Sequence, residues 1–139
     1  MTYLLDTNVL SEGMRPQPDP LVIAWLDQHQ EELALSALSL AELARGAEAV
    51  ADGKRKKELL KRLRYLQEDF ADAILPFDDA AAREWARYCK RLHSEGCSIP
   101  VIDSLIAATA LAYGLTVVTR NTSDFPGVTM KNPFSSLMP

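Results

Sequence analysis

Short apolar runs alternate along this chain with longer segments whose apolar residues recur every three or four positions. Continuous runs of this kind are typical of buried strands, and the helical recurrence is typical of helices with one face on a core. The runs lie at 1–5, 33–37, 73–75 and 115–119, and a shorter edge strand is expected at 128–130. A short helix is expected after residue 8. Further helices are expected at 21–30, from 39 onward, at 54–70, from 79 toward 96, and at 100–113.

Residues with strong backbone preferences mark where these helices begin and end. Ser39 is expected to open its helix, which places Glu42 in the first turn. The prolines between 15 and 20 indicate a loop, because proline lacks an amide donor. Pro100 suits the first turn of the last helix, and Gly114 suits its left-handed end.

The alternation of strands and helices predicts an α/β fold. Helical connections favour right-handed crossovers and a mainly parallel sheet that is buried on both faces. We therefore expect a three-layer sandwich, in which four to five strands are covered by helices on both sides. With 139 residues and no internal repeat or long linker, the chain is expected to form a single domain over 1–139.

Composition narrows the class of protein. Lys and Arg number 15 against 19 Asp and Glu, and the net charge of −4 disfavours binding to nucleic acid by general electrostatics. The sequence has no apolar run of ~18 residues and no secretory signal pattern, which predicts a cytoplasmic protein without a membrane segment. Cys89 and Cys97 are expected to be free thiols.

Acidic and polar residues follow the predicted strands at their carboxyl ends, where open α/β sheets bind ligands. Asp6 follows the first strand, and Glu42 lies shortly after the second. Asn121 and Asp124 follow the last long strand, and Asp103 begins the helix that leads into that strand. The topology therefore brings four acids that are distant in sequence toward one crevice.

Each of these residues also has a purely structural interpretation. Asp6 suits an Asx turn, and Glu42 with the serine three positions earlier matches a capping box. Asp103 suits the positive end of its helix dipole. Asn121 and Asp124 are common turn residues. The sequence leaves these interpretations open beside that of a shared site.

Considered together, the acids favour a metal site. Two unpaired carboxylates ~4 Å apart repel by about 4 kcal/mol at an effective dielectric constant near 20, well above the roughly 0.3–1 kcal/mol gained at a helix start. Protonation of one carboxyl or a divalent cation would offset this repulsion. Oxygen ligands favour Mg²⁺ or Mn²⁺, which supports phosphodiester hydrolysis by water. His29 and His93 lack the spacing of a zinc pair.

Four segments resemble, in order, the successive motifs of the PIN-domain toxins, which are ribonucleases of the virulence-associated protein C (VapC) type. They are 4–12 (LLDTNVLSE), 36–46 (SALSLAELARG), 102–110 (IDSLIAATA) and 115–125 (LTVVTRNTSDF). The stretch 15–18 (RPQP) is similar to the FitB-like branch of the family. This resemblance spans nearly the whole chain and implies an endoribonuclease that depends on Mg²⁺ or Mn²⁺.

The resemblance also implies which residues carry the chemistry. By motif position, Asp6, Glu42 and Asp103 correspond to the catalytic acids that hold the metal. The fourth catalytic position, commonly Asp in the family, is Asn121 here. Asp124 lies three residues later and either substitutes as a metal ligand or shapes the turn.

Further residues and partners are expected to assist these acids. Supporting hydrogen bonds are expected from Thr7, Asn8 and Thr119. The resemblance implies a homodimer and a small cognate antitoxin that inserts into the active-site groove. A larger complex with that antitoxin could also bind operator DNA.

Basic residues gather between positions 45 and 64, so the overall acid excess conceals a locally positive segment. We expect part of this segment to steer RNA phosphates, and a solvated helix face is the competing interpretation. The residues concerned are Arg45, Lys54, Arg55, Lys56 and Lys57.

Two alternative functions follow from the same residues. A catalytically silent PIN-like module would act only through antitoxin or nucleic-acid contacts, and the neutral Asn121 keeps this alternative open. A receiver-like signalling domain is disfavoured, because it needs an adjacent acidic pair near the start and a lysine after a late strand. The acids do not distinguish RNA from DNA, and the sequence identifies neither the RNA target nor the cleavage site.

Overall fold

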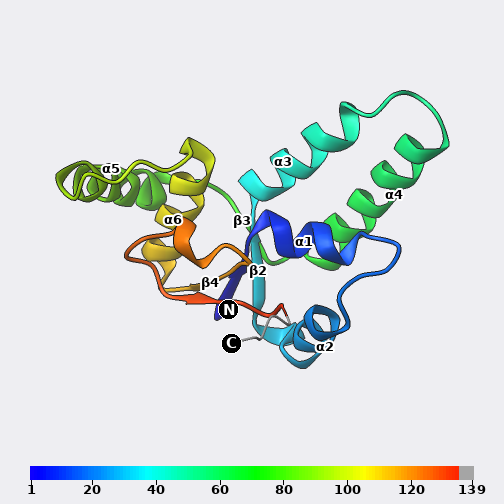
Figure 1. Cartoon of the computed structure of the whole chain (residues 1–139), viewed down its shortest axis with the longest axis horizontal. Coiled ribbons are helices and arrows are strands. Elements are labelled where there is room, and N and C mark those ends of the chain that lie inside the picture. The colour runs from blue at the N-terminus through cyan, green and yellow to red at the C-terminus, as the bar shows by residue number, and fades with distance from the viewer. Residues whose placement is uncertain (135–139) are drawn as a thin grey trace.

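A five-stranded sheet runs through the centre of the computed structural model, which describes residues 1–134 (Figure 1). The strands are β1 (Tyr3–Leu5), β2 (Leu33–Ser36), β3 (Ile74–Leu75), β4 (Thr116–Val118) and β5 (Met130–Lys131). They lie in the order β3-β2-β1-β4-β5, and each neighbouring pair in this described sheet is parallel. The predicted parallel sheet of four to five strands is confirmed.

Helices cover both faces of the sheet. Within the described residues the α-helices are α1 (Thr7–Gly13), α2 (Pro20–Gln28), α3 (Ala37–Glu48), α4 (Lys54–Asp69), α5 (Asp79–Ser94) and α6 (Val101–Tyr113). Two 3-10 helices are η1 (Gln30–Glu32) and η2 (Thr122–Asp124). In Figure 1, α5 and α6 lie on one side of the sheet, and α1, α2 and α4 lie on the other. The predicted three-layer sandwich is therefore confirmed.

The core is divided in two because successive residues of a strand point to opposite faces of the sheet. Leu4 of β1 and Val117 of β4 pack against α5 and α6. Their neighbours Leu5 and Val118 pack on the other face, against α1 and α2. Each full burial of such a side chain contributes about 1.5–3 kcal/mol, so both helix layers hold the carboxyl edge of the sheet in place.

The start of α3 corrects one prediction. The helix begins at Ala37 and is capped by Ser36, whose Oγ accepts a hydrogen bond from the Leu38 amide at 3.0 Å. Glu42 therefore lies in the second turn, and the capping box with Ser39 does not form. Ser36 ends β2 with extended backbone and can cap at once, while Ala37 and Leu38 are strong helix formers, so no loop is needed.

The ends of α6 lie close to their predicted positions. Pro100 stands one residue before the helix, at the N-cap, rather than in its first turn. Gly114 ends the helix in the left-handed conformation with φ +65°, as predicted. Among residues 1–134, no helix has both the length and the apolar character needed to cross a membrane.

Candidate active site

Four acidic residues lie on segments at the carboxyl edge of the sheet. Asp6 follows β1 and is the N-cap of α1, and Asp103 lies in the first turn of α6. Glu42 projects from α3, which begins where β2 ends, and Asp124 ends η2 after β4. The strands β2, β1 and β4 are neighbours, so the segments that follow them emerge side by side.

Both carboxylate oxygens of Asp6 accept hydrogen bonds, and the residue is only 5% exposed. Its Oδ1 accepts from the Thr7 amide at 2.8 Å. Its Oδ2 accepts from Thr119 Oγ1 at 2.9 Å and from Asn8 Nδ2 at 3.2 Å. Thr7, Asn8 and Thr119, which were expected to support the acids, therefore all donate hydrogen bonds to Asp6. The fold thus sets the orientation of this carboxylate.

Asn8 and Thr119 link the segments that follow β1 and β4. Asn8 Nδ2 donates to Thr119 Oγ1 at 3.1 Å, and the same hydroxyl oxygen accepts from the Asn121 amide at 3.0 Å. On its other side, Asn8 Oδ1 accepts from the Arg120 amide at 3.1 Å. This network fixes the start of the loop that carries Asn121 and Asp124.

Glu42 is tied to the same edge from the other side. Thr7 Oγ1 donates a hydrogen bond of 2.5 Å to Glu42 Oε1, joining residues 35 positions apart. Thr7 thus contacts two of the acids, with its amide on Asp6 and its hydroxyl on Glu42. The half-buried Glu42 side chain is held toward the segment that follows β1.

The pKa values of two of these carboxyl groups, Asp6 and Asp103, are raised. Burial is the main cause that raises the pKa of Asp6, against the lowering effect of the Thr119 and Thr7 hydrogen bonds, and Glu42 and Asp124 raise it further. The pKa of Asp103 rises to about 6, first because of burial and then because of Asp6, Glu42 and Asp124. The four negative groups therefore share one electrostatic environment, and a cation there would relieve their repulsion.

The chemistry of these donors fits a hard divalent ion. Carboxylates and hydroxyls are oxygen donors, which Mg²⁺ and Mn²⁺ prefer. Among residues 1–134, no three Asp, Glu, His or Cys side chains stand close enough to share one ion. Mg²⁺ commonly keeps several waters and takes only one or two protein carboxylates together with substrate phosphates, so the donors remain suited to it.

The two polar residues of the η2 segment take different positions. Asn121 is exposed and joins the network through its backbone amide. Asp124 is half-buried, and its charge raises the pKa of both Asp6 and Asp103. The structure thus brings Asp124 into the electrostatic environment of the acids, while the described hydrogen bonds of Asn121 come from its backbone.

The predicted steering residues do not behave as one group. Arg45, Lys54, Arg55 and Lys57 are exposed. Lys56 is different, because its side chain is only 18% exposed and its Nζ lies 3.0 Å from the Glu48 carbonyl oxygen and 3.3 Å from Asp52 Oδ1. These contacts close the turn between α3 and α4, so the charge of Lys56 is used within the fold.

Glu12 is a buried acid that the sequence motifs did not indicate as a site residue. Its side chain, at the end of α1, is 5% exposed and lies 3.1 Å from Arg15 Nη1 and 3.9 Å from Arg120 Nη2. Its Oε2 also accepts from the Asp19 amide at 2.7 Å. The available signal was an acid inside the first motif, on a short helix whose other side is apolar, shortly before an arginine.

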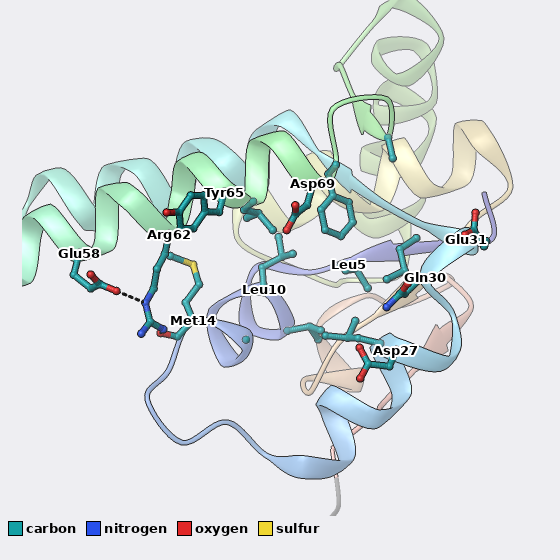
Figure 2. A pocket seen from close by; sticks show the side chains of 17 residues that line it. Leu5, Leu10, Met14, Asp27, Gln30, Glu31, Glu58, Arg62, Tyr65 and Asp69 are labelled. Atoms are coloured by element: carbon teal, nitrogen blue, oxygen red, sulfur yellow. Dashed lines mark hydrogen bonds and ion pairs between the residues drawn. The ribbon is translucent and has the colours of Figure 1, made fainter.

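A groove in the described structure is lined by none of these four acids. It has a volume of about 870 Å³ between α1, α2 and α4. Figure 2 shows Leu10 among its apolar lining residues, with Asp27, Glu58 and Arg62 around it. Arg62 donates to the Met14 carbonyl oxygen at 2.5 Å and to Glu58 Oε1 at 3.1 Å, which joins α4 to the end of α1.

Comparison with known proteins identifies the class. Residues 3–128 match the PIN domain family. Toxin FitB of Neisseria gonorrhoeae is 44% identical over 124 residues, which are 88% of this chain and 89% of the relative. VapC ribonuclease Y4jK of Sinorhizobium fredii is 42% identical over 135 residues, 94% of this chain and 96% of the relative. The chain belongs to the PIN-domain family and, within it, to the VapC and FitB toxins, as its motifs predicted.

Solved structures agree with this assignment. The crystal structure of FitAcB from Neisseria gonorrhoeae superposes with a TM-score of 0.88 at 43% identity, over 95% of this chain and 98% of that one. The structure of FitAB bound to an IR36 DNA fragment gives the same TM-score at 40% identity, over 95% of each chain. The five-stranded parallel sheet with its helices is therefore the fold of these relatives.

Proposed function

We propose that this protein is the toxin of a type II toxin–antitoxin system and an endoribonuclease that hydrolyses RNA phosphodiesters with the help of Mg²⁺ or Mn²⁺. One observation carries the proposal. Asp6, Glu42, Asp103 and Asp124 come from four separate segments, and at one edge of the sheet the charges of Glu42 and Asp124 help to raise the pKa values of Asp6 and Asp103. Such an arrangement is costly for folding alone and useful for binding a cation.

Each residue has a distinct role in this proposal. Asp6, Glu42 and Asp103 would hold the ion, one or two of them directly and the rest through its waters, and Asp124 would supply the fourth carboxylate in place of the neutral Asn121. When bound, the divalent ion lowers the pKa of water and stabilises negative charge on the scissile phosphate.

The polar neighbours of the acids orient them for binding the ion. Thr119 and Asn8 orient Asp6, and Thr7 orients Glu42 through their hydrogen bonds. These contacts reduce the reorganisation that ion binding requires.

The partners follow from the family. The relatives FitAcB and FitAB, the latter bound to DNA, support a complex of this toxin with a cognate antitoxin on operator DNA. The groove between α1, α2 and α4 has apolar lining residues and charged residues around them, which suit the apolar face of a partner helix. A cytoplasmic homodimer that the antitoxin neutralises is the state we propose.

Substituting Asp6→Asn tests the proposed activity. The change removes one ligand charge at nearly constant volume, so RNA cleavage should fall by about 100-fold or more and growth toxicity should be lost, while the circular dichroism spectrum stays that of a folded protein. Wild-type cleavage should stop with EDTA and return with Mn²⁺.

Asp72→Asn is the matched control, because Asp72 is exposed and precedes β3 at the opposite end of the strands. This variant should cleave RNA as the wild type does. An Asp6→Asn protein with full EDTA-sensitive cleavage would contradict the proposed mechanism. A wild-type protein that binds RNA but never cleaves it would instead favour the catalytically silent module.

A further inference from the structure

Arg120 stands beside the acids without being one of the proposed catalytic residues. It directly follows Thr119, and its backbone amide donates to Asn8 Oδ1 at 3.1 Å. Asn8 Nδ2 in turn donates to Asp6 Oδ2 at 3.2 Å. The main chain of Arg120 is therefore linked to the Asp6 carboxylate through a single side chain.

The guanidinium group of Arg120 is restrained by two buried side chains and still reaches solvent. Its Cζ lies 3.9 Å from the centre of the Phe134 ring, and its Nη2 lies 3.9 Å from Glu12 Oε1. Phe134 and Glu12 are buried, whereas the Arg120 side chain is 53% exposed. A guanidinium stacked on a ring keeps its N–H donors in the plane of the group, free to bind an anion.

Glu12 does not fully neutralise the positive charge of Arg120. Arg15 Nη1 lies 3.1 Å from the same carboxylate, closer than Arg120, and the Asp19 amide bonds its other oxygen at 2.7 Å. Two guanidinium groups face one carboxylate, so Glu12 by itself does not neutralise both of them. A distance of 3.9 Å is also too long for a hydrogen bond between Arg120 and Glu12.

The position of this positive charge indicates what it binds. Glu12 lies six residues along α1 from Asp6, roughly 9 Å at 1.5 Å per residue. The Arg120 guanidinium, 3.9 Å from Glu12, therefore lies at the end of α1 away from Asp6, while its backbone stays joined to the Asp6 network through Asn8. We propose that Arg120 binds a backbone phosphate of the RNA next to the scissile phosphate, with Glu12 and Phe134 as its positioning residues. This inference rests on the proposed ribonuclease function.

The test measures binding and cleavage separately. In an Asp6→Asn background, Arg120→Gln should weaken binding of a single-stranded RNA oligonucleotide about tenfold, and the slope of log affinity against log salt should become shallower by roughly 0.7, as expected for one lost phosphate contact. In the otherwise wild-type protein, Arg120→Gln should raise KM with little change in kcat. Arg120→Lys should recover part of the affinity, because lysine keeps the charge without the planar fork.

Arg87→Gln is the matched control, since Arg87 is an exposed arginine of α5 that pairs with Glu84. It should leave affinity, salt slope and KM unchanged. Phe134→Leu tests the positioning role, because it keeps an apolar side chain but removes the ring beneath the guanidinium. It should raise KM less than Arg120→Gln does.

The outcomes separate this inference from the proposed function. If the wild type cleaves RNA and Arg120→Gln matches Arg87→Gln in affinity, salt slope and KM, the inference is overturned and the ribonuclease stands. If Arg120→Gln lowers kcat alone at unchanged affinity, phosphate binding is also overturned. If the wild type neither cleaves nor binds RNA, the proposed function fails and the inference fails with it.

Discussion

Individual carboxylates in this protein have a structural role beside the chemistry that we propose for them. Asp6 caps α1 through its Oδ1, as its turn-forming interpretation suggested, and its Oδ2 accepts hydrogen bonds from Thr119 and Asn8. Its pKa is nevertheless raised, because burial outweighs these favourable bonds. The cap alone does not require this burial, which agrees with the additional role that we propose for Asp6.

Asp103 gives the metal-free protein a defined pH dependence. Its pKa is about 6 in the folded state against an ordinary value of 3.8, so the folded state holds this proton more tightly than the unfolded state does. The resulting stability is fully present below about pH 3.8 and is lost as the pH rises through 6. We expect Asp103→Asn to raise the melting temperature at pH 7 and to change it little at pH 3.8.

Thermal unfolding in EDTA between pH 3.8 and 7 measures this difference, with Asp72→Asn as the control. The gap between Asp103→Asn and wild type should grow with pH, and Mn²⁺ at pH 7 should stabilise the wild type more than the variant. A gap that is the same at pH 3.8 and pH 7 would mean that the Asp103 charge is not the cause.

Asp124 and Asn121 can be distinguished by substitution. Asp124→Asn removes a charge that acts on both Asp6 and Asp103, so cleavage should fall by about tenfold or more. Asn121→Ala keeps the backbone bond to Thr119, and its cleavage should fall much less. Initial cleavage rates at saturating Mn²⁺ check this order, and the reverse order would make Asn121 the fourth catalytic position, as the family motif implied.

At the scale of elements, α3 shows how a tight strand-to-helix junction places a site residue. Because Ser36 ends β2 and caps α3 itself, the helix begins directly at the sheet edge. Glu42 therefore lies one turn into the helix, where Thr7 from the neighbouring segment reaches it. Ser39 becomes a fully buried side chain whose Oγ has no hydrogen-bond partner among the described residues.

Ser36, the N-cap of α3, and Ser39, inside α3, should respond oppositely to alanine. Ser36→Ala loses the cap and should lower the free energy of unfolding by about 1 kcal/mol. Ser39→Ala removes a buried hydroxyl that lacks a partner and adds a better helix former, so the free energy of unfolding should rise. Urea unfolding of both variants measures this, and a helix that truly began at Ser39 would give a loss for Ser39→Ala instead.

At the scale of the whole molecule, charge is segregated rather than balanced. The net charge of −4 includes the four acids at the sheet edge, while exposed basic residues stand on α3 and α4. These two helices pack together and project from the sheet (Figure 1). A cation among the acids and a positive helical arm would together let an acidic protein approach RNA.

Charge reversal on α4 tests whether this arm steers RNA. Lys54, Arg55 and Lys57 changed together to Glu should lower RNA affinity and weaken its salt dependence, because long-range attraction to phosphates becomes repulsion. Lys56→Gln is the contrasting variant, and it should lower the melting temperature with a smaller effect on affinity, since Lys56 closes the turn between α3 and α4. An unchanged salt dependence in the triple variant would leave the arm as a solvated face.

The sequence by itself determined the α/β class, the parallel sheet and the family, because strands and helices have different local periods and motifs keep their order along the chain. It also indicated the acids at the strand ends. Only the tertiary structure decided that Ser36 rather than Ser39 opens α3. It also decided that the charge of Asp124 acts on Asp6 and Asp103, and that the Arg120 guanidinium lies by Glu12 and Phe134. Each of these depends on contacts between residues far apart in the chain or on burial, which no local pattern encodes.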